Sequence, residues 1–258
     1  VLRSLRKLYG QITQLNQELE DKVNARTQEL SHSLESLTKL KKQQDGDYYL
    51  TSLLLRPLGL NMSIPVDVKV EYITEQYKKF QFQKWHSEIG GDLCRADTVK
   101  LRGRNITVFL SADAMGKSIQ GAGGALVLGA VFDSLIERTR LEENFQNLYP
   151  ERWLKKAFVE LHKVFESFDG TMLTSVVLGM VENDTGFLYY ISAEHPDPVL
   201  YRDNIAVFLS PEKSYRKLGA HVGHQPLQFT CFQLKQGDIF ICGSDGRDDL
   251  LMGEGDSE

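Results

Sequence analysis

The sequence has few cysteines and no paired cysteine motif. Its three cysteines, Cys94, Cys231 and Cys242, are odd in number and lie far apart in apolar surroundings. Such a set offers neither a disulfide framework nor a C-x-x-C metal site. We therefore expect a protein of a reducing compartment, the cytoplasm.

Long apolar runs and dense positive tracts are also missing. No apolar run approaches the length that a membrane-spanning helix needs, and Val1 opens an amphipathic pattern rather than a signal peptide. The net charge is −5, and no tract of Lys and Arg is dense enough to attract nucleic acid. We therefore expect no nucleic-acid partner. The absent initiator Met indicates a piece of a longer protein, whose upstream sensor part could be membrane-bound.

The N-terminal segment, residues 1–45, carries a narrow apolar stripe. Apolar residues follow one another in steps of three and four, slip once, and then continue: Leu5, Leu8, Ile12, Leu15, Leu19, Val23, Leu30, Leu34 and Leu37. This heptad pattern with a stutter predicts a parallel coiled coil that forms a homodimer and acts as a signalling linker. The alternative is a single helix lying on its own domain.

Residues 46–62 predict a junction between this linker and a body. Tyr48–Leu58 is apolar on more than one side, and Pro57 and Gly59 end it. A short helix of this kind is expected to pack where the coiled coil meets the body and to act as a switch.

The body, residues 63–258, alternates strand and helix patterns. Helical periodicity covers 121–139 and 151–168. Strand patterns lie on both sides of the helices, at 68–73, 79–85, 99–101, 106–110, 173–181, 186–192, 199–201, 206–209, 228–233 and 238–242. Strand groups separated by a block of helices predict an α+β fold with segregated layers of sheet and helix.

Three aspartates stand at predicted strand ends beside small residues. Asp92 ends E-I-G-G-D, Asp113 lies in S-A-D-A-M-G-K, and Asp245 lies in C-G-S-D-G. Carboxylates with small neighbours suit Mg²⁺ or Mn²⁺, which prefer oxygen ligands and retain several waters. The alternative for each is a turn former or a helix cap. Three such turns in one chain favour a metal site.

Other motifs are weaker. The glycine cluster, Gly121 to Gly129, fits neither the dinucleotide nor the P-loop pattern and favours close packing of a helix on a sheet. His195 either donates to a phosphate or ties a proline-rich turn together, and we favour the second. His221 and His224 lack the helical H-E-x-x-H context of a zinc site.

Five motifs in order resemble the SpoIIE/RsbU-like branch of the metal-dependent type 2C serine/threonine phosphatases. They are E-I-G-G-D, A-D-A-M-G-K-S-I-Q-G-A, T-M-L-T-S-V-V-L-G-M-V, L-Y-Y-I-S-A-E-H-P-D-P-V-L and G-D-I-F-I-C-G-S-D-G. The resemblance, over about residues 66–249, implies a two-sheet β-sandwich flanked by helices, with two Mn²⁺ or Mg²⁺ ions between the sheets.

By this resemblance, Asp92, Asp113, the backbone carbonyl of Ala114 and Asp245 are the metal ligands. His195, Gly91 and Gly246 are candidates for the layer of residues just behind them. The reaction is hydrolysis by a metal-activated water, so no catalytic side-chain nucleophile is expected.

The resemblance also implies a further metal-binding aspartate some tens of residues beyond the D-G turn. Asp248, Asp249 and Asp256 lie too close to Asp245 for that place. We therefore expect that residues 63–258 lack the C-terminal end of the phosphatase domain. Leu93, Cys94 and Arg95 also depart from the family's G-G-D-Y-Y-D, and Ser118 stands where glycine is common.

Two functions follow. The first is a bacterial signalling phosphatase, regulated through its linker, that dephosphorylates a Ser or Thr of an anti-sigma-factor antagonist of the STAS type. The second is a catalytically incomplete module of the same fold that binds a partner or dimerises.

Overall fold

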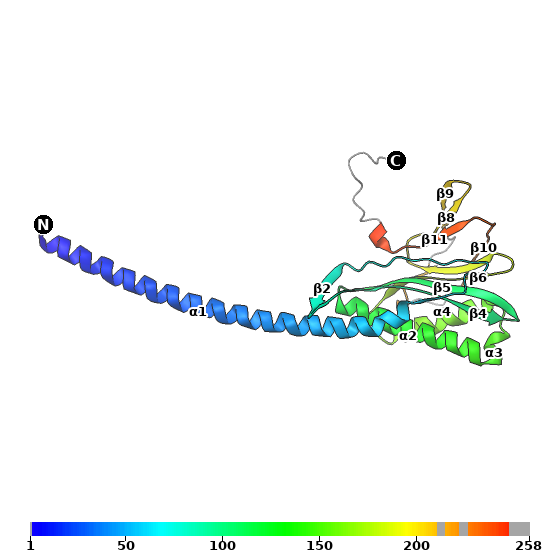
Figure 1. The fold of residues 1–258 in the computed structure, drawn as a ribbon, viewed down its shortest axis with the longest axis horizontal. Helices are drawn as coiled ribbons and strands as arrows, with labels where there is room; N and C mark the ends of the chain where they lie inside the picture. Colours follow the sequence, from blue (N-terminus) through cyan, green and yellow to red (C-terminus); the bar gives the residue numbers. More distant parts are fainter. Residues whose placement is uncertain (1, 211–214, 222–226, 248–258) are drawn as a thin grey trace. The chain divides into compact units, whose positions relative to one another are not determined.

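The computed structural model describes residues 2–210, 215–221 and 227–247. The chain divides into two compact units, Val1–Asp47 and Tyr48–Glu258. One continuous helix, α1 (Leu2–Leu55), includes the first unit and the start of the second, and the 3₁₀ helix η1 (Arg56–Gly59) follows it (Figure 1). The polar run before Tyr48 therefore does not interrupt the helix; it contains no proline, and its single glycine, Gly46, is tolerated.

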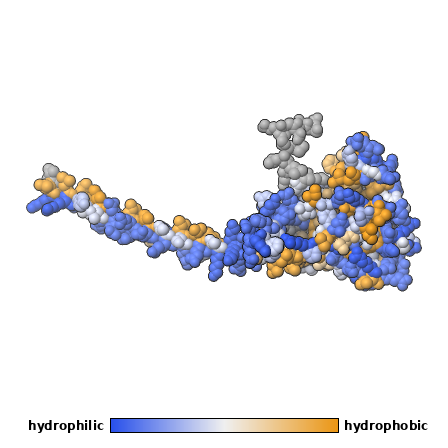
Figure 2. Space-filling view, viewed as in Figure 1, coloured by the Kyte–Doolittle hydropathy of each residue, from blue (hydrophilic) through white to orange (hydrophobic). Residues whose placement is uncertain are grey.

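In the first unit, α1 is exposed on all sides. Residues 2–44 are all exposed, and the stripe residues Leu8 and Leu15 are 60% and 63% accessible. Figure 2 shows orange, apolar side chains along one side of this helix and blue, polar ones along the other. Because most helical stability in proteins comes from packing of an apolar face, this helix has an unused packing surface.

A six-stranded sheet is the centre of the second unit. Its strand order is β1-β4-β5-β6-β7-β10, and all neighbours are antiparallel except β1 and β4. The strands are β1 (Asn61–Met62), β4 (Asp92–Leu101), β5 (Arg104–Ala114), β6 (Thr174–Glu182), β7 (Phe187–Ala193) and β10 (Thr230–Gln233). The predicted hairpin between β4 and β5 is confirmed: Arg102 and Gly103, both at positive φ, form a two-residue turn.

Three helices follow β5, and two of them cover one face of this sheet. They are α2 (Ile119–Leu141), the short α3 (Glu143–Gln146) and α4 (Pro150–Glu166). The apolar residues of α4, such as Trp153 and Leu161, recur every three or four positions and are buried against β6 and β7. Together with α2 and the covered face of the sheet they form the main hydrophobic core.

Helix α2 corrects one sequence expectation. By length and composition alone it could cross a membrane, although we expected no apolar run of that length. Its buried residues, including Leu128 and Phe132, contact the sheet and the core instead. A core helix covered on one side by a sheet needs this apolar composition, so the run has a packing explanation.

A three-stranded sheet lies on the other face of the six-stranded sheet. Its order is β11-β8-β9, with β8 (Val199–Arg202), β9 (Ile205–Phe208) and β11 (Ile239–Ile241). Phe240 of β11 packs on Phe109 and Tyr190, with ring centroids 5.7 and 5.5 Å apart. Two facing sheets with helices on the outer face of the larger one confirm the predicted α+β sandwich.

A hairpin, β2 (Lys78–Phe82) and β3 (Trp85–Ile89), packs on the end of α1 through Tyr48 and Phe80, whose ring centroids are 5.6 Å apart. The predicted strand at 68–73 is wrong. Residues 63–77 form no strand, and the short β1 pairs with β4 at Ala96 and Asp97 instead. The Tyr72 hydroxyl holds this segment by donating to the Gly59 carbonyl at 2.7 Å.

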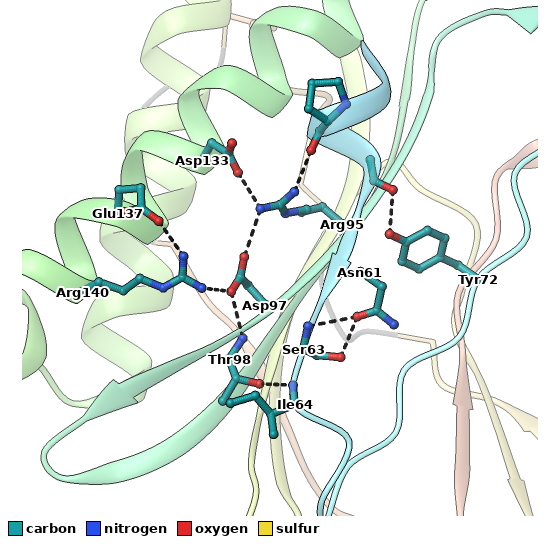
Figure 3. Close-up of polar contacts among 12 residues, drawn as sticks. Asn61, Ser63, Ile64, Tyr72, Arg95, Asp97, Thr98, Asp133, Glu137 and Arg140 are labelled. Carbon is teal, nitrogen blue, oxygen red and sulfur yellow. Dashed lines mark hydrogen bonds and ion pairs between the residues drawn. The ribbon is translucent and has the colours of Figure 1, made fainter. Parts of the chain in front are cut away.

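Buried charges join β4 to α2 and to η1 (Figure 3). Arg95 of β4 pairs with Asp97 at 3.1 Å and with Asp133 of α2 at 2.8 Å, and it donates to the Pro57 carbonyl at 2.9 Å. Arg140 of α2 pairs with the other oxygen of Asp97. This charge cluster fixes the start of the body, just after α1, to the strand that begins with Asp92.

Candidate metal centre

Asp92 and Asp113 are neighbours at one end of the six-stranded sheet. Asp92 begins β4, Asp113 is the penultimate residue of β5, and the two are directly opposite in the antiparallel register. Directly opposite residues share a face of the sheet with Cβ atoms roughly 5 Å apart. The face is the inner one, between the two sheets, so both carboxylates lie in the sandwich.

Asp245 approaches this pair from the second sheet. It begins the 3₁₀ helix η2 (Asp245–Arg247), which follows β11. The pKa of Asp113 is raised to about 6, mainly by burial and further by the charges of Asp92 and Asp245, with Lys217 acting in the opposite direction. Burial also raises the pKa of Asp92, where a hydrogen bond from Ser244 opposes the shift and Asp245 adds to it. The three aspartates therefore share one electrostatic environment.

Glycines leave room around the Ala114 carbonyl. A Cβ on Gly91 would lie 2.1 Å from the Ala114 carbonyl oxygen and 3.1 Å from Asp113 Oδ1, and a Cβ on Gly121 would lie 3.1 Å from the same carbonyl. Only glycine permits this close approach without a shift of the backbone. Gly91 and Gly121 thus keep the oxygen atoms of Asp113 and Ala114 uncovered by side chains.

The oxygen donors fit a hard divalent cation. Among residues 2–210, 215–221 and 227–247, no three His, Cys, Asp or Glu side chains form a ready-made cluster for one ion. Mg²⁺, however, is commonly held by one or two carboxylates, with waters and substrate phosphates as its other ligands. Asp92, Asp113 and the Ala114 carbonyl meet that requirement, and Asp245 is a nearby further carboxylate.

A cavity of about 700 Å³ opens beside Asp92. Its lining combines the inner face of β4 and β5 with the 70–75 segment and the end of β11, and includes Asp92, Cys94, Ser111, Tyr72, Ile241 and Ser244. The volume is typical of ligand-binding clefts. A side chain of a ligand can therefore be accommodated next to Asp92.

His195 connects two strands on the same inner face. Its Nδ1 lies 3.1 Å from the Ser175 hydroxyl and its Nε2 lies 3.3 Å from the Ser111 hydroxyl, and the residue is 5% exposed. Ser175 is directly opposite Asp113 in the register. The geometry agrees with the favoured interpretation, in which His195 ties the turn after β7 to β5 and β6.

Sequence reasoning missed Gln76, Ser111 and Ser175. The side-chain nitrogen of Gln76, Nε2, donates to the Asp92 backbone carbonyl at 2.9 Å. The side-chain oxygen of Gln76 is buried against Gly90 and has no partner among the described residues. The register of β5 and β6 brings Ser175 next to Asp113. No local pattern marks these residues, because each reaches the site through contacts distant in sequence.

The other candidates lie apart or behind the site. His221 Nε2 is 3.3 Å from Asp169 on the surface, and His224 lies outside the described residues. Gly246 follows Asp245 within η2. The glycine cluster of α2 confirms close helix packing: a Cβ on Gly124 would lie 2.6 Å from the Ala114 Cβ.

Comparison with solved structures finds weak similarities. The RsbU and RsbW domains of a Mycobacterium tuberculosis protein are 20% identical, with a TM-score of 0.47, over 62% of this chain and 40% of that one. The PP2C phosphatase domain with part of the regulatory domain of SpoIIE from Bacillus subtilis is 13% identical, with a TM-score of 0.45, over 62% and 41%. This chain thus spans about two fifths of the length of each. The catalytic domain of the phosphatase PstP, solved with two manganese ions, is 16% identical, with a TM-score of 0.42, over 64% and 82%.

Comparison by sequence gives the family. No curated protein matches the chain. The model of the stage II sporulation protein E family matches residues 104–257, which include Asp113 and Asp245 but begin after Asp92. More than half of the chain is matched, and the resemblance indicated by the five motifs is confirmed. The chain therefore belongs to the stage II sporulation protein E (SpoIIE) family, the SpoIIE/RsbU-like branch of the PP2C-type phosphatases.

Proposed function

We propose that this chain is a metal-dependent serine/threonine phosphoprotein phosphatase of bacterial signalling. The observation that carries the proposal is the direct opposition of Asp92 and Asp113 on the inner face of the sheet, beside a carbonyl that Gly91 leaves uncovered. Membership of the SpoIIE family supports the same reaction.

The residues of the chain have distinct roles in this proposal. Asp92, Asp113 and the Ala114 carbonyl would hold Mn²⁺ or Mg²⁺, two ions in all, and Asp245 would add a ligand from the second sheet. When bound, the ions supply an activated water and neutralise charge on the phosphoryl group. Gly91 gives the oxygen donors room, and the register of β4 and β5 holds the two carboxylates without help from flexible loops. The cavity beside Asp92 admits the phosphorylated residue.

The first test is hydrolysis of a phosphoserine peptide by this chain in the presence of Mn²⁺. Asp113→Asn is expected to lower kcat/KM by at least about 100-fold, since an amide is a poor substitute for a ligating carboxylate. Asp203→Asn is the matched control: Asp203 is an exposed turn residue at positive φ, which Asn tolerates equally well. Equal activity of Asp113→Asn and Asp203→Asn would sink the proposal.

A second candidate is a non-catalytic module of the same fold that captures a partner. The observation in its favour is the lack of a three-residue metal cluster within the described residues. Titration calorimetry with Mn²⁺ discriminates the two functions. The phosphatase binds Mn²⁺ and loses this binding in Asp113→Asn, whereas the module gives no heat of binding in either protein.

We also propose that α1 pairs with a second copy as a parallel coiled coil and that this cytoplasmic dimer carries a sensor signal to the phosphatase. The support is the exposed stripe of the helix, in which Leu15 and Leu19 are 63% and 61% accessible. By family membership, we further propose a STAS-type anti-sigma-factor antagonist as substrate.

Sedimentation of the intact chain tests the dimer. The double variant Leu15→Lys/Leu19→Lys is expected to shift the dimer to monomer, since two charges enter the seam. Gln17→Lys/Asn24→Lys, on the opposite side of the helix, adds the same charge and should leave the dimer intact. A wild-type chain that is monomeric at high concentration contradicts the coiled coil.

A further inference from the structure

The edge of β6 next to Ser175 is occupied by a segment that the sequence motifs did not identify. Strand β7 ends at Ala193, which pairs with Val176, so the start of β6 has a free edge. Leu218 takes this edge. Its amide donates to the Thr174 carbonyl at 2.8 Å, and the Thr174 amide donates to the Leu218 carbonyl at 3.2 Å, as an antiparallel bridge.

This bridge sets the direction of the neighbouring side chains. Thr174 and Leu218 are opposite each other and fully buried. One residue on, the antiparallel register brings Lys217 opposite Ser175, and alternation directs both to the other face of the sheet. That face carries Asp92 and Asp113. Across this end of the inner face, four residues therefore follow one another on β4, β5, β6 and the segment around Leu218: Asp92, Asp113, Ser175 and Lys217.

Lys217 is close enough to the carboxylates to act on them. Its charge opposes the rise in the pKa of Asp113. Adjacent strands lie about 4.8 Å apart, so two strand spacings separate the backbones, and the flexible four-carbon stem of lysine covers part of that distance. The two residues thus face the same end of the sandwich.

The Lys217 ammonium is not used elsewhere in the described part of the chain. No hydrogen bond or ion pair of its side chain occurs there, whereas the adjacent Arg216 pairs with Glu194 at 3.3 Å. The Arg216 side chain is 70% exposed. Two neighbouring basic residues therefore differ: one is paired at the surface, and the other faces the carboxylates.

We propose that Lys217 binds the phosphoryl group of the substrate. This inference rests on the proposed phosphatase function and names a residue for substrate recognition. Divalent ions among three carboxylates attract a phosphate dianion, but a lysine repels those ions and so suits the anion rather than the metal. An ammonium offers three donors to phosphoryl oxygens, in charge-assisted hydrogen bonds. At the end of the row, beyond Ser175, it contacts the substrate without displacing a metal ligand.

The experiment compares Lys217→Gln, Lys217→Arg and the matched control Arg216→Gln in the intact, Mn²⁺-loaded chain. Lys217→Gln should raise KM for a phosphoserine peptide and the inhibition constant of inorganic phosphate by about 10- to 100-fold, with kcat changed far less. Lys217→Arg should restore much of the loss, because it keeps the charge. Arg216→Gln should leave both constants within about twofold. Calorimetry with Mn²⁺ should show unchanged or tighter metal binding in Lys217→Gln.

Direct binding of inorganic phosphate, followed by phosphorus NMR, separates this inference from the proposed function. If the wild type binds phosphate but does not hydrolyse the peptide, and Lys217→Gln does not bind phosphate, the phosphatase function is wrong and the anion site is supported. If the wild type and Lys217→Gln are both active and have equal KM values and equal inhibition by phosphate, only the anion site is overturned. Weaker Mn²⁺ binding together with a lower Tm in Lys217→Gln also overturns it, since Lys217 would then be a structural counterion of Asp113. A wild type that neither binds inorganic phosphate nor hydrolyses the phosphoserine peptide overturns both the anion site and the proposed phosphatase function.

Discussion

Strand β4 carries charge on both of its faces, fully buried on one and half-buried on the other, and the two faces differ in how that charge is balanced. On the face toward α2, Asp97 is fully buried between Arg95 and Arg140 (Figure 3). On the inner face, five residues earlier, Asp92 is opposite another carboxylate, Asp113. One aspartate is surrounded by cations and the other by acids.

The two faces also differ in what acts on the pKa of their aspartates. Burial raises the pKa of Asp97, but Arg140 and Arg95 oppose the shift. At Asp113, burial and two further carboxylates all raise the pKa, and Lys217 opposes them. Buried charges are stable when paired and costly when they are not. Asp97 therefore already has its counterions, whereas the acids of the inner face form no ion pair within the described residues.

The largest expected effect lies on the α2 face. Asp97→Asn should lower the free energy of unfolding by about 3 kcal/mol, because it removes the fully buried carboxylate and leaves the buried Arg95 with only the partly exposed Asp133, while the exposed Arg140 keeps Glu137. Urea denaturation with Asp203→Asn as the surface control measures this. A loss under about 1 kcal/mol would mean that the two faces do not differ in the proposed way.

The next effect concerns the room around the ligands on the inner face. Gly91→Ala should cost about 1–3 kcal/mol and weaken Mn²⁺ binding, because the new Cβ would lie 2.1 Å from the Ala114 carbonyl oxygen. Gly123→Ala is the control. Its Cβ would meet only the Met172 Cε, at 3.8 Å, so the better helix propensity of Ala should stabilise α2 by up to about 1 kcal/mol. Denaturation and Mn²⁺ calorimetry of both variants give the comparison, and a Gly91→Ala protein as stable as Gly123→Ala would contradict it.

Much of the fold could be predicted from the sequence because its signals are local. The periodicity of α2 and α4, the turn at Arg102 and Gly103 and the strand patterns depend on residues near one another in the chain. The strand expected at 68–73 is absent although its pattern is typical of a strand, because a strand also needs a pairing partner, which residues near one another in the chain do not specify.

The site divides in the same way. Asp92, Asp113 and Asp245 stand in recognisable turns, so the sequence identifies them. Ser175 and Lys217 reach the same face only through the pairing of β5 with β6 and of Thr174 with Leu218. No pattern along the chain contains that information, because it arises from the register between strands.

A smaller effect, of opposite sign to that of Asp97→Asn, is expected on the inner face. In the presence of EDTA, Asp113→Asn should raise the free energy of unfolding by up to about 1 kcal/mol, since it removes one of several mutually repelling carboxylates that are partly open to solvent. Thermal denaturation should show a Tm higher by a few degrees. With Mn²⁺ added, the order should reverse, because wild type then gains the binding energy of the ion. If Asp113→Asn is less stable than the wild type in EDTA, the Asp113 carboxylate stabilises the metal-free fold, as the Asp97 carboxylate does.

The smallest effect concerns a hydrogen bond to Asp92. This bond stabilises the charge of Asp92, whereas two arginines stabilise the charge of Asp97. Ser244 donates to this carboxylate and thereby opposes the rise in its pKa. Ser244→Ala should cost about 0.5–1 kcal/mol in the metal-free protein, a typical net value for one hydrogen bond. In an Asp92→Asn background the same substitution should cost measurably less, because the charged acceptor is gone, and a double-mutant cycle isolates the difference. If Ser244→Ala lowers the free energy of unfolding equally in the two backgrounds, Ser244 does not stabilise the Asp92 charge. The charge of Asp92 would then lack even this hydrogen bond.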